Sequence, residues 1–338
     1  MVSAVTSSLS KPAHIPAECV VDLNIFDLPL TNVQDPQAAY AAFRKSGDIL
    51  WTPHNDGHWI LTRAEDIKAV QNDWKNFIRS PQVSIPPVER STPAIPIQLD
   101  PPIHAPFRRP LTKMLLPKTV EEMAVKVRSV AISLIEAVMS RGECDFVKEL
   151  AELFPILIFL DLVDLPHSDR EYLLPLAEAQ TRGGSAEDQM KAFQALGAYL
   201  APIVAQRQAN PGSDLFSAMV SVEVHGTVIS FEDALNFCTT VIVAGLDTVA
   251  SMMGFIMRHF ALHREHRVDF VQNMGDDTFV RNVVEEMLRR YSVATSTRVV
   301  ANDMEYKGLK FMKGDMILTS ATYANTEDQR AIGTPFVG

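Results

Sequence analysis

The chain has 338 residues, of which 47% are hydrophobic, so it can bury a large core as one big domain or two ordinary ones. Its formal net charge is −10, from 31 basic and 41 acidic residues, and no basic block stands out, which argues against a nucleic-acid partner. The three cysteines, Cys19, Cys144 and Cys238, lie far apart without disulfide or zinc-site spacing, which favours a reducing, cytoplasmic location.

The amino terminus contains neither the apolar core of a signal peptide nor the long run of a membrane anchor. We expect residues 1–20 to be a mobile tail.

A β-hairpin is predicted over 47–61, where two apolar runs are joined through the turn sequence Asn55-Asp56-Gly57. Thr62 and Glu65 then have the spacing of a capping box, which predicts a short helix up to about Asp73. The proline-rich stretch 79–106 predicts a long, shaped loop of the kind that often binds ligands.

This loop ends in the sequence DPPIHAPFRR, residues 100–109. His104 and Arg108 are four residues apart, so a helix that begins near Ala105 would let both donate hydrogen bonds to one anion. A solvated basic turn is the alternative, and the spacing alone favours it.

Helices dominate the centre of the chain. Between 118 and 139 apolar residues recur at helical spacing and Gly142 follows, which predicts a core-facing helix. Further helices are predicted over 150–165, 168–181 and 187–208.

The longest predicted helix covers 230–258 and is apolar on every side. Ser230 and Asp233 have the capping-box pattern at its start, and no proline interrupts it. Its length also suits a membrane span, but interior polar residues and the lack of flanking basic clusters argue against a membrane.

One acid, Asp247, lies in the apolar middle of this helix. An ionisable group in such a place is costly unless paired, so Asp247 has a task or a partner. Gly245 leaves room for something to approach the backbone, and Thr248 can donate to the carbonyl of Ala244. A buried helix with a packing glycine and a satisfied acid is the alternative.

Three histidines, His259, His263 and His266, follow at the end of the long helix. Phe260 stands where a zinc protease motif requires a glutamate, so a polar helix end explains the histidines better than a metal site.

A last helix is predicted over 277–291, with an apolar stripe that leaves Glu286 and Arg289 outside it as a surface ion pair. Short β-branched and aromatic runs between 297 and 319 predict a small antiparallel sheet.

Three motifs occur together: AGLDT at 244–248, Glu-x-x-Arg at Glu286 and Arg289, and DPP-x-H-x-x-x-R at 100–108. In this order and at these separations they resemble the cytochrome P450 family of haem-thiolate monooxygenases, most closely the soluble bacterial branch that includes the camphor hydroxylases. The resemblance extends from about Leu23 to the end. It implies a mainly α fold with a minor antiparallel β-sheet, as a single domain over 21–338, and a monomer without a membrane or nucleic-acid partner.

The resemblance also implies haem b as the cofactor and assigns roles to individual residues. Ala244 and Gly245 match a groove where dioxygen binds, and Asp247 and Thr248 match an acid and an alcohol that supply protons for cleavage of the O–O bond. The remaining matches are donors to the haem propionates and a buried structural ion pair: His104, Arg108 and Arg298 for the propionates, Glu286 and Arg289 for the pair.

The substrate pocket of the family matches Thr92, Thr240, Val243 and Ala294, which are small and weakly polar. Camphor-type enzymes have a tyrosine where Thr92 aligns, so the resemblance implies a different small apolar substrate, of terpenoid or aromatic type. Electrons would come from an iron–sulfur ferredoxin.

The sequence departs from the family in one motif. The cysteine loop F-x-x-G-x-x-x-C-x-G, which supplies the axial iron ligand, does not occur in the 338 residues, and none of the three cysteines matches it. We therefore expect a C-terminally truncated family member without a metal ligand of its own. Such a chain alone would neither bind haem with thiolate ligation nor hydroxylate a substrate. A non-catalytic remnant that binds a small ligand or haem is the alternative function.

Overall fold

The computed structural model describes residues 10–27, 36–82, 84–87, 92–182 and 186–327, which are mainly helical with small sheets, as predicted. The chain divides into two compact units. Thr92–Gly254 build the first, called here the helical unit. Ser3–Ser91 and Phe255–Gly338 build the second, called here the sheet unit. The long helix α9, Phe231–Leu262, contributes to both.

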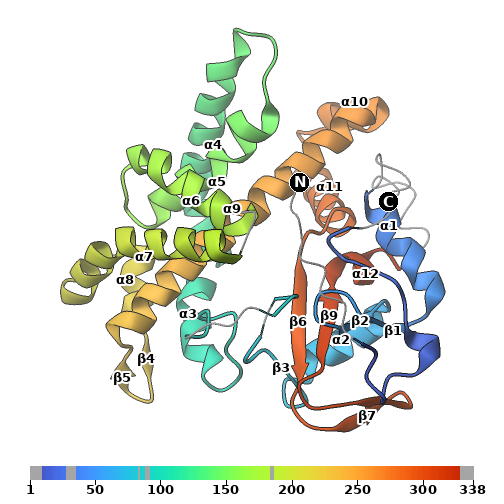
Figure 1. The fold of residues 1–338 in the computed structure, drawn as a ribbon. Helices are drawn as coiled ribbons and strands as arrows, with labels where there is room; N and C mark the ends of the chain where they lie inside the picture. Colours follow the sequence, from blue (N-terminus) through green and yellow to red (C-terminus); the bar gives the residue numbers. More distant parts are fainter. Residues whose placement is uncertain (1–9, 28–35, 83, 88–91, 183–185, 328–338) are drawn as a thin grey trace. The chain divides into compact units, whose positions relative to one another are not determined.

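In the helical unit, α6 (Arg170–Arg182) and α7 (Ala186–Ala209) lie side by side (Figure 1). Its helices are α3 His104–Met114, α4 Pro117–Met139, a π-helical turn Val147–Ala151, α5 Leu153–Leu162, a 3₁₀ turn His167–Asp169, α6 Arg170–Arg182, α7 Ala186–Ala209, α8 Leu215–Val220 and the first part of α9. The strands β4 Glu223–Val224 and β5 Thr227–Val228 form a short hairpin.

The core of this unit forms around α5, which is apolar almost throughout. Ile156 and Leu160 are completely buried and share one cluster with Leu196 and Leu200 of α7. Phe237 of α9 joins the same cluster. The core therefore fixes the buried side of α9.

The helix α4 has the predicted extent, but its predicted core-facing stripe is only half right. None of its residues is buried. Val130 and Leu134 pack against the core, whereas Val120 and Ile135 are 48% and 49% exposed. Helical spacing predicts which residues share a face, but not what covers that face.

The helix α9 begins at the predicted capping box. Ser230 Oγ accepts from the backbone N–H of Asp233 (3.0 Å) and donates to its carboxylate (2.9 Å). The helix ends at Leu262, four residues beyond the predicted end. It is long and apolar enough to cross a membrane by length and composition, a test that core helices of soluble proteins also pass.

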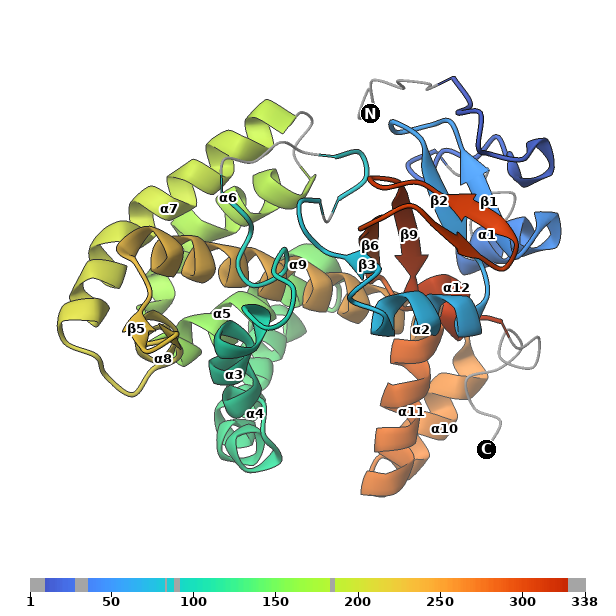
Figure 2. The same ribbon diagram turned by 90° about the horizontal axis from the view of Figure 1, so that it is seen from below.

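The sheet unit contains a five-stranded sheet in the order β1-β2-β9-β6-β3 (Figure 2). Its strands are β1 Ile49–Thr52, β2 His58–Leu61, β3 Phe77–Ile78, β6 Thr295–Val300, β7 Met304–Tyr306, β8 Leu309–Phe311 and β9 Met316–Ser320. Its helices are a 3₁₀ turn Ala17–Cys19, α1 Pro36–Phe43, a 3₁₀ turn Arg44–Ser46, α2 Ala64–Asn72, the end of α9, α10 Arg264–Asn273, α11 Asp277–Arg290 and α12 Ala321–Asn325.

The antiparallel pairing predicted over 297–319 is confirmed, because β6 pairs with β9 and β7 with β8 in antiparallel fashion. The sheet is larger than predicted, since β9 also pairs in parallel with β2, with Trp59 opposite Ile317, and β7 and β8 form a separate hairpin. Local patterns do not show which distant strand completes a sheet.

The β1–β2 hairpin is confirmed, with left-handed backbone at Asn55, Asp56 and Gly57. Trp59 of β2 is completely buried, lies 4.5 Å from the Phe311 ring and donates from Nε1 to Asp315 Oδ2 (3.0 Å). All three tryptophans of the chain, Trp51, Trp59 and Trp74, belong to this unit.

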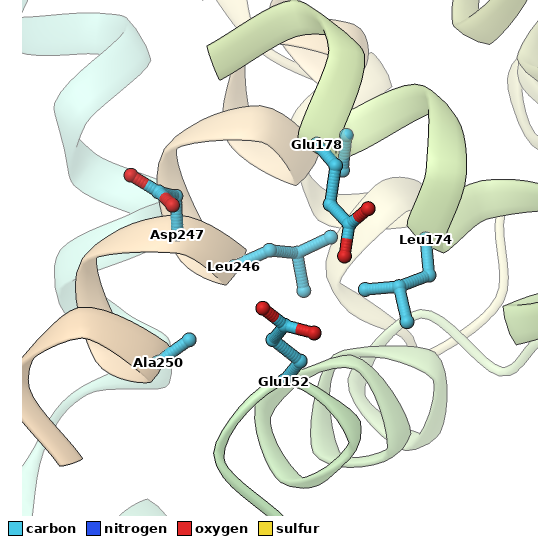
Figure 3. A pocket seen from close by; sticks show the side chains of 7 residues that line it. Glu152, Leu174, Glu178, Leu246, Asp247 and Ala250 are labelled. Atoms are coloured by element: carbon cyan, nitrogen blue, oxygen red, sulfur yellow. The ribbon is translucent and has the colours of Figure 1, made fainter. Parts of the chain in front are cut away.

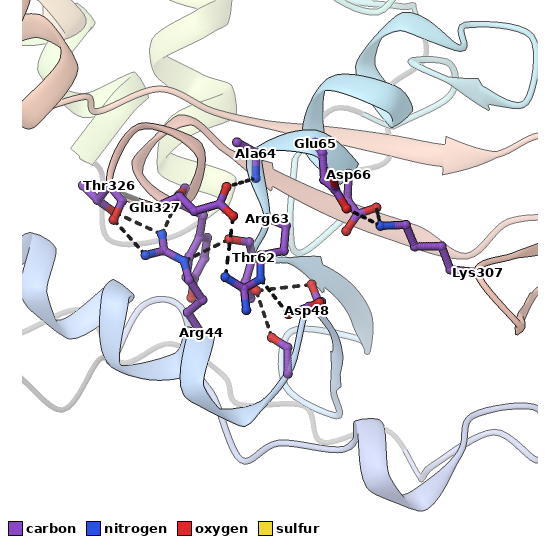
Figure 4. Close-up of polar contacts among 12 residues, drawn as sticks. Arg44, Asp48, Thr62, Arg63, Ala64, Glu65, Asp66, Lys307, Thr326 and Glu327 are labelled. Carbon is purple, nitrogen blue, oxygen red and sulfur yellow. Dashed lines mark hydrogen bonds and ion pairs between the residues drawn. The ribbon is translucent and has the colours of Figure 1, made fainter. Parts of the chain in front are cut away.

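The predicted capping box at Thr62 and Glu65 is wrong, although α2 ends where predicted. Thr62 Oγ1 donates to the carbonyl of Gly47 (2.8 Å), so its hydroxyl is used by the hairpin. The carboxylate of Glu327 accepts from the N–H of Ala64 (2.7 Å) and caps α2 from a distant part of the sequence (Figure 4).

The other end of the polar network in Figure 4 is formed around Asp66, which is completely buried on α2. Its carboxylate accepts from Lys307 Nζ and from the Tyr306 hydroxyl, both at 2.7 Å. Burial, followed by the hydrogen bond to Asp66, raises the pKa of Tyr306 to about 12. The β7–β8 hairpin is thereby tied to α2.

Part of the segment predicted as a mobile tail packs against the sheet unit. Ile15 is 1% exposed and Cys19 8%, and Val20 forms a β-bridge with Trp51. Residues 1–9 lie outside the described residues.

The polar helix end predicted for the three histidines is wrong for His259, which is only 3% exposed. Its Nδ1 shares a hydrogen bond with the Tyr291 hydroxyl just after α11 (2.7 Å). This partner is 32 residues away and has no local signature in the sequence.

Candidate active site

The middle of α9 has one covered and one uncovered side. Leu246 and Ala250 are buried in the helical unit, whereas Ala244 and Thr248, one turn apart, are exposed. The uncovered side thus carries small side chains in the middle of an apolar helix.

Thr248 keeps its hydroxyl on this uncovered side, where Oγ1 donates to the carbonyl of Ala244 (3.1 Å). A methyl group at Gly245 would meet only Phe159 Cδ2, at 3.9 Å, which is an ordinary contact. The described neighbours therefore do not require glycine at this position.

Asp247 is half-buried and lines a small pocket with Glu152 and Glu178 (Figure 3). Figure 3 shows the Glu152 and Glu178 carboxylates pointing into the space beside Leu246, while the Asp247 carboxylate points to another side of α9. The sequence did not predict either glutamate, because both lie on other helical segments and match no motif.

Two of the predicted pocket residues are connected through Asn236, which sequence reasoning missed. Asn236 Nδ2 donates to Thr92 Oγ1 (3.2 Å), and its Oδ1 accepts from Thr240 Oγ1 (3.4 Å) and from the N–H of Ile95 (3.0 Å). A polar residue one turn before Thr240 on an apolar helix was the available signal. Val243 is half-buried one turn from Thr240.

His104 and Arg108 share one side of α3, which begins at His104. The backbone N–H of His104 bonds to the carbonyl of Asp100 (3.1 Å), so the proline-rich loop leads directly into the helix. Arg108 is exposed and His104 half-buried. This arrangement can present two donors to an anion.

The sheet unit contains the other predicted residues. Arg289 and Glu286 of α11 form a bidentate ion pair, with both N–O distances at 2.6 Å and both side chains about a quarter exposed. Arg289 also donates to the carbonyl of Asn325. Arg298 on β6 is 4% exposed and donates to its neighbour's carbonyl (2.9 Å), and Ala294 is exposed just before β6.

The cysteines differ in environment. Cys238 lies on α9 and is completely buried, and burial followed by the charge of Asp214 raises the pKa of its thiol strongly. Burial also raises the pKa of Cys19. Cys144 is exposed beyond the end of α4. Both buried thiols thus favour their protonated form, which is a poor metal ligand.

The comparisons with known proteins agree with this geometry. The family model for cytochrome P450 matches residues 167–329. The probable cytochrome P450 127A1 of Sinorhizobium fredii is 28% identical to this chain, and the alignment covers 94% of this chain and 78% of the relative. The erythromycin C-12 hydroxylase of Saccharopolyspora erythraea is 30% identical to this chain, and the alignment covers 80% of this chain and 69% of the relative.

Two solved structures are similar over almost the whole chain. CYP101J2 has a TM-score of 0.85 at 32% sequence identity, and the superposition covers 97% of this chain and 82% of CYP101J2. CYP101C1 has a TM-score of 0.83 at 32% identity, with 96% and 81% covered. The chain belongs to the cytochrome P450 family, in its soluble bacterial branch.

Members of this family are monooxygenases that bind haem b and use dioxygen, an organic substrate and a redox partner. The residues on α9 fit such a group on their uncovered side, because the small side chain of Ala244 leaves space there and Thr248 offers a hydroxyl. The donors His104 and Arg108 suit carboxylates such as the haem propionates.

Proposed function

We propose that the chain carries the oxygen-activating residues of a monooxygenase that inserts one atom of dioxygen into a small apolar substrate of terpenoid or aromatic type. The observation that carries this proposal is the Ala244–Thr248 turn, which combines exposed small residues, a hydroxyl and a neighbouring acid on an apolar helix. When bound, haem supplies the iron that reacts with dioxygen.

The chain's own residues supply protons and space. Ala244 and Gly245 leave the groove for dioxygen. Thr248 holds a proton at Oγ1, and the carboxyl of the neighbouring residue Asp247 would replace it through water. Positioned proton donors of this kind contribute about 10²–10⁴-fold in rate.

The other predicted residues bind and orient. His104 and Arg108, together with Arg298, would donate hydrogen bonds to the haem propionates. Thr92, Thr240 and Val243, with Ala294, would contact the substrate. Asn236 would hold Thr92 and Thr240 in place, which the hydrogen bonds at 3.2 and 3.4 Å support. Glu286 and Arg289 would act as a structural pair.

The remaining proposals follow from the family. The electron donor is an iron–sulfur ferredoxin, the protein works as a monomer in the cytoplasm, and it needs neither membrane nor nucleic acid. The net charge of −10 supports the absence of nucleic acid.

A second candidate function is a non-catalytic ligand- or haem-binding protein on the same scaffold. The placement of the cysteines favours it, because Cys19 and Cys238 are buried and Cys144 lies beyond α4. We infer that none of the three is the axial ligand and that the 338-residue chain alone does not hydroxylate.

Two proteins test this pair of functions: the chain itself, and the chain extended with the cysteine-loop segment of the Sinorhizobium relative. Each is loaded with haem, reduced and treated with carbon monoxide, then supplied with ferredoxin, ferredoxin reductase, NADH and ¹⁸O₂ in the presence of terpenes and aromatic hydrocarbons. We expect the red-shifted thiolate Soret band and ¹⁸O-labelled product only from the extended protein.

A thiolate band from the 338-residue chain would disprove the inference about the cysteines. An extended protein with the thiolate band but no labelled product from any compound would count against the monooxygenase and favour the binding protein.

A further inference from the structure

The turn between α9 and α10 gathers groups that bind transition metals. The metal-binding atoms of His263, Glu265 and His266 all lie within 4.8 Å of one another. Tetrahedral ligands about 2.1 Å from zinc lie roughly 3.4 Å apart, so small side-chain rotations would bring the three onto one ion. Their sequence H-R-E-H also lacks any known zinc-motif spacing, which is why the sequence did not predict them.

The three side chains are accessible and close in sequence. His263 directly precedes α10, and Glu265 and His266 belong to its first turn. The side chains of His263 and Glu265 are 45% and 70% exposed. A site built from four consecutive residues closes only a very short loop, so little chain entropy is lost when an ion binds.

The buried His259 gives one ligand a fixed orientation. His259 Nε2 lies 3.0 Å from His266 Nδ1, and the two rings stack with an interplanar angle of 6°. When His266 Nδ1–H is the donor, His259 Nδ1–H donates in turn to the Tyr291 hydroxyl (2.7 Å). This tautomer leaves the Nε2 lone pair of His266 for a metal, and such support is usual for histidine ligands.

Two acids lie beside the site, and Arg264 lies between the proposed ligands. Glu265 is a ligand, and Asp269 lies one turn further along α10. The nearby Arg267 is turned to the end of α9, where Nη1 donates to the carbonyl of Phe260 (2.6 Å). The Arg267 guanidinium is therefore hydrogen-bonded to the end of α9.

We propose that His263, Glu265 and His266 bind one divalent transition ion of the zinc type, with water as a fourth ligand. The ion fixes the turn between α9 and α10 and is separate from the haem iron of the family. No covalent or redox chemistry is involved.

Zinc binding to the 338-residue chain, prepared without a histidine tag, tests this proposal by competition with a chromogenic zinc chelator. We expect one zinc per chain with micromolar or tighter affinity. His263→Ala, Glu265→Gln and His266→Ala should each bind at least tenfold more weakly. Two controls should bind like wild type: His225→Asn, which replaces an exposed histidine in the β4–β5 turn, and Cys144→Ser, which removes the exposed thiol.

A second measurement does not depend on the chelator. Zinc should raise the melting temperature of the wild type and of both controls, and should not raise that of His263→Ala. Absence of zinc binding in the wild type, unchanged binding by the three variants, or an equal loss in either control would overturn the proposal. A cluster that only caps α9 through hydrogen bonds would give the first of these results.

Discussion

Trp59 in the sheet unit and the Ala244–Thr248 turn in the helical unit differ in how far neighbouring side chains cover them. Trp59 is completely buried, packed against the tilted ring of Phe311 and hydrogen-bonded through its Nε1. Thr248 and Ala244 are exposed, and the Thr248 hydroxyl donates to the carbonyl of Ala244 within its own helix. A residue with complementary packing stabilises the fold, whereas small exposed residues on an apolar helix indicate a binding or catalytic site.

The comparison predicts its largest effect at Trp59. Trp59→Ala should lower the free energy of unfolding by about 3–5 kcal/mol, because it removes a large buried side chain and leaves a cavity. Urea denaturation followed by far-UV circular dichroism measures it. Trp59→Phe keeps a ring against Phe311 and should lose much less. Equal losses in both variants would show that the hydrogen bond to Asp315, and not the packing, stabilises this region.

A second effect in the sheet unit depends on pH. His58 is 1% exposed, and neither ring nitrogen has a hydrogen-bond partner among the described residues. Burial lowers the pKa of His58 from 6.5 to about 4. Below pH 6.5 the unfolded chain therefore takes up a proton that the folded chain does not. The free energy of unfolding should fall as the pH falls from about 6.5 to 4, by about 3 kcal/mol for this group.

Urea denaturation at pH 7 and pH 4.5 measures this dependence. His58→Leu should remove His58's share of the difference between the two pH values, and the exposed-site control His225→Asn should keep it. If His58→Leu shows the wild-type difference, His58 is protonated in the folded protein or other groups cause the pH dependence.

A smaller effect is expected at Asn236 in the helical unit. Asn236→Ala leaves the N–H of Ile95 without its side-chain acceptor, which should cost about 1–2 kcal/mol in the free energy of unfolding. Asn236→Asp keeps an acceptor oxygen for Ile95 and loses the donor to Thr92. The aspartate variant should recover most of the stability in urea denaturation. Equal losses would place the stabilising contact at Thr92.

The smallest effect on stability is expected at Thr248. Thr248→Ala should change the free energy of unfolding by less than about 0.5 kcal/mol, since the residue is exposed and alanine favours helix. In the extended, haem-loaded protein the same variant should consume more NADH per product formed. Thr248→Ser retains the hydroxyl and should restore the wild-type ratio. A wild-type ratio in Thr248→Ala would contradict the proton-donating role.

The sequence predicted the parts of the molecule that depend on neighbours in the chain. The capping box at Ser230 and the hairpin turn at Asn55–Gly57 are local, and both are confirmed. The helix α3 begins at His104, one residue before the start considered from the sequence. The family resemblance came from motifs at the right separations, and the comparisons confirm it.

Apart from the stripe on α4, the features that the sequence missed share one cause, which is a partner far away in the sequence. Glu327 caps α2, so the local capping box at Thr62 is not needed. The Tyr291 hydroxyl shares a hydrogen bond with the buried His259, and β2 pairs with β9, more than two hundred residues away in the sequence. Asn236 was missed in the candidate site for the same reason, because Thr92 and Ile95 reach it from the proline-rich loop.

The placement of Trp51, Trp59 and Trp74 in one unit has a practical consequence. Indole emission excited at the red edge of the absorption band comes from the sheet unit alone, and the helical unit is dark at that wavelength. A single heated sample therefore yields two melting curves, one from emitted light and one from ellipticity. Whether the curves coincide tells directly whether the two units unfold together.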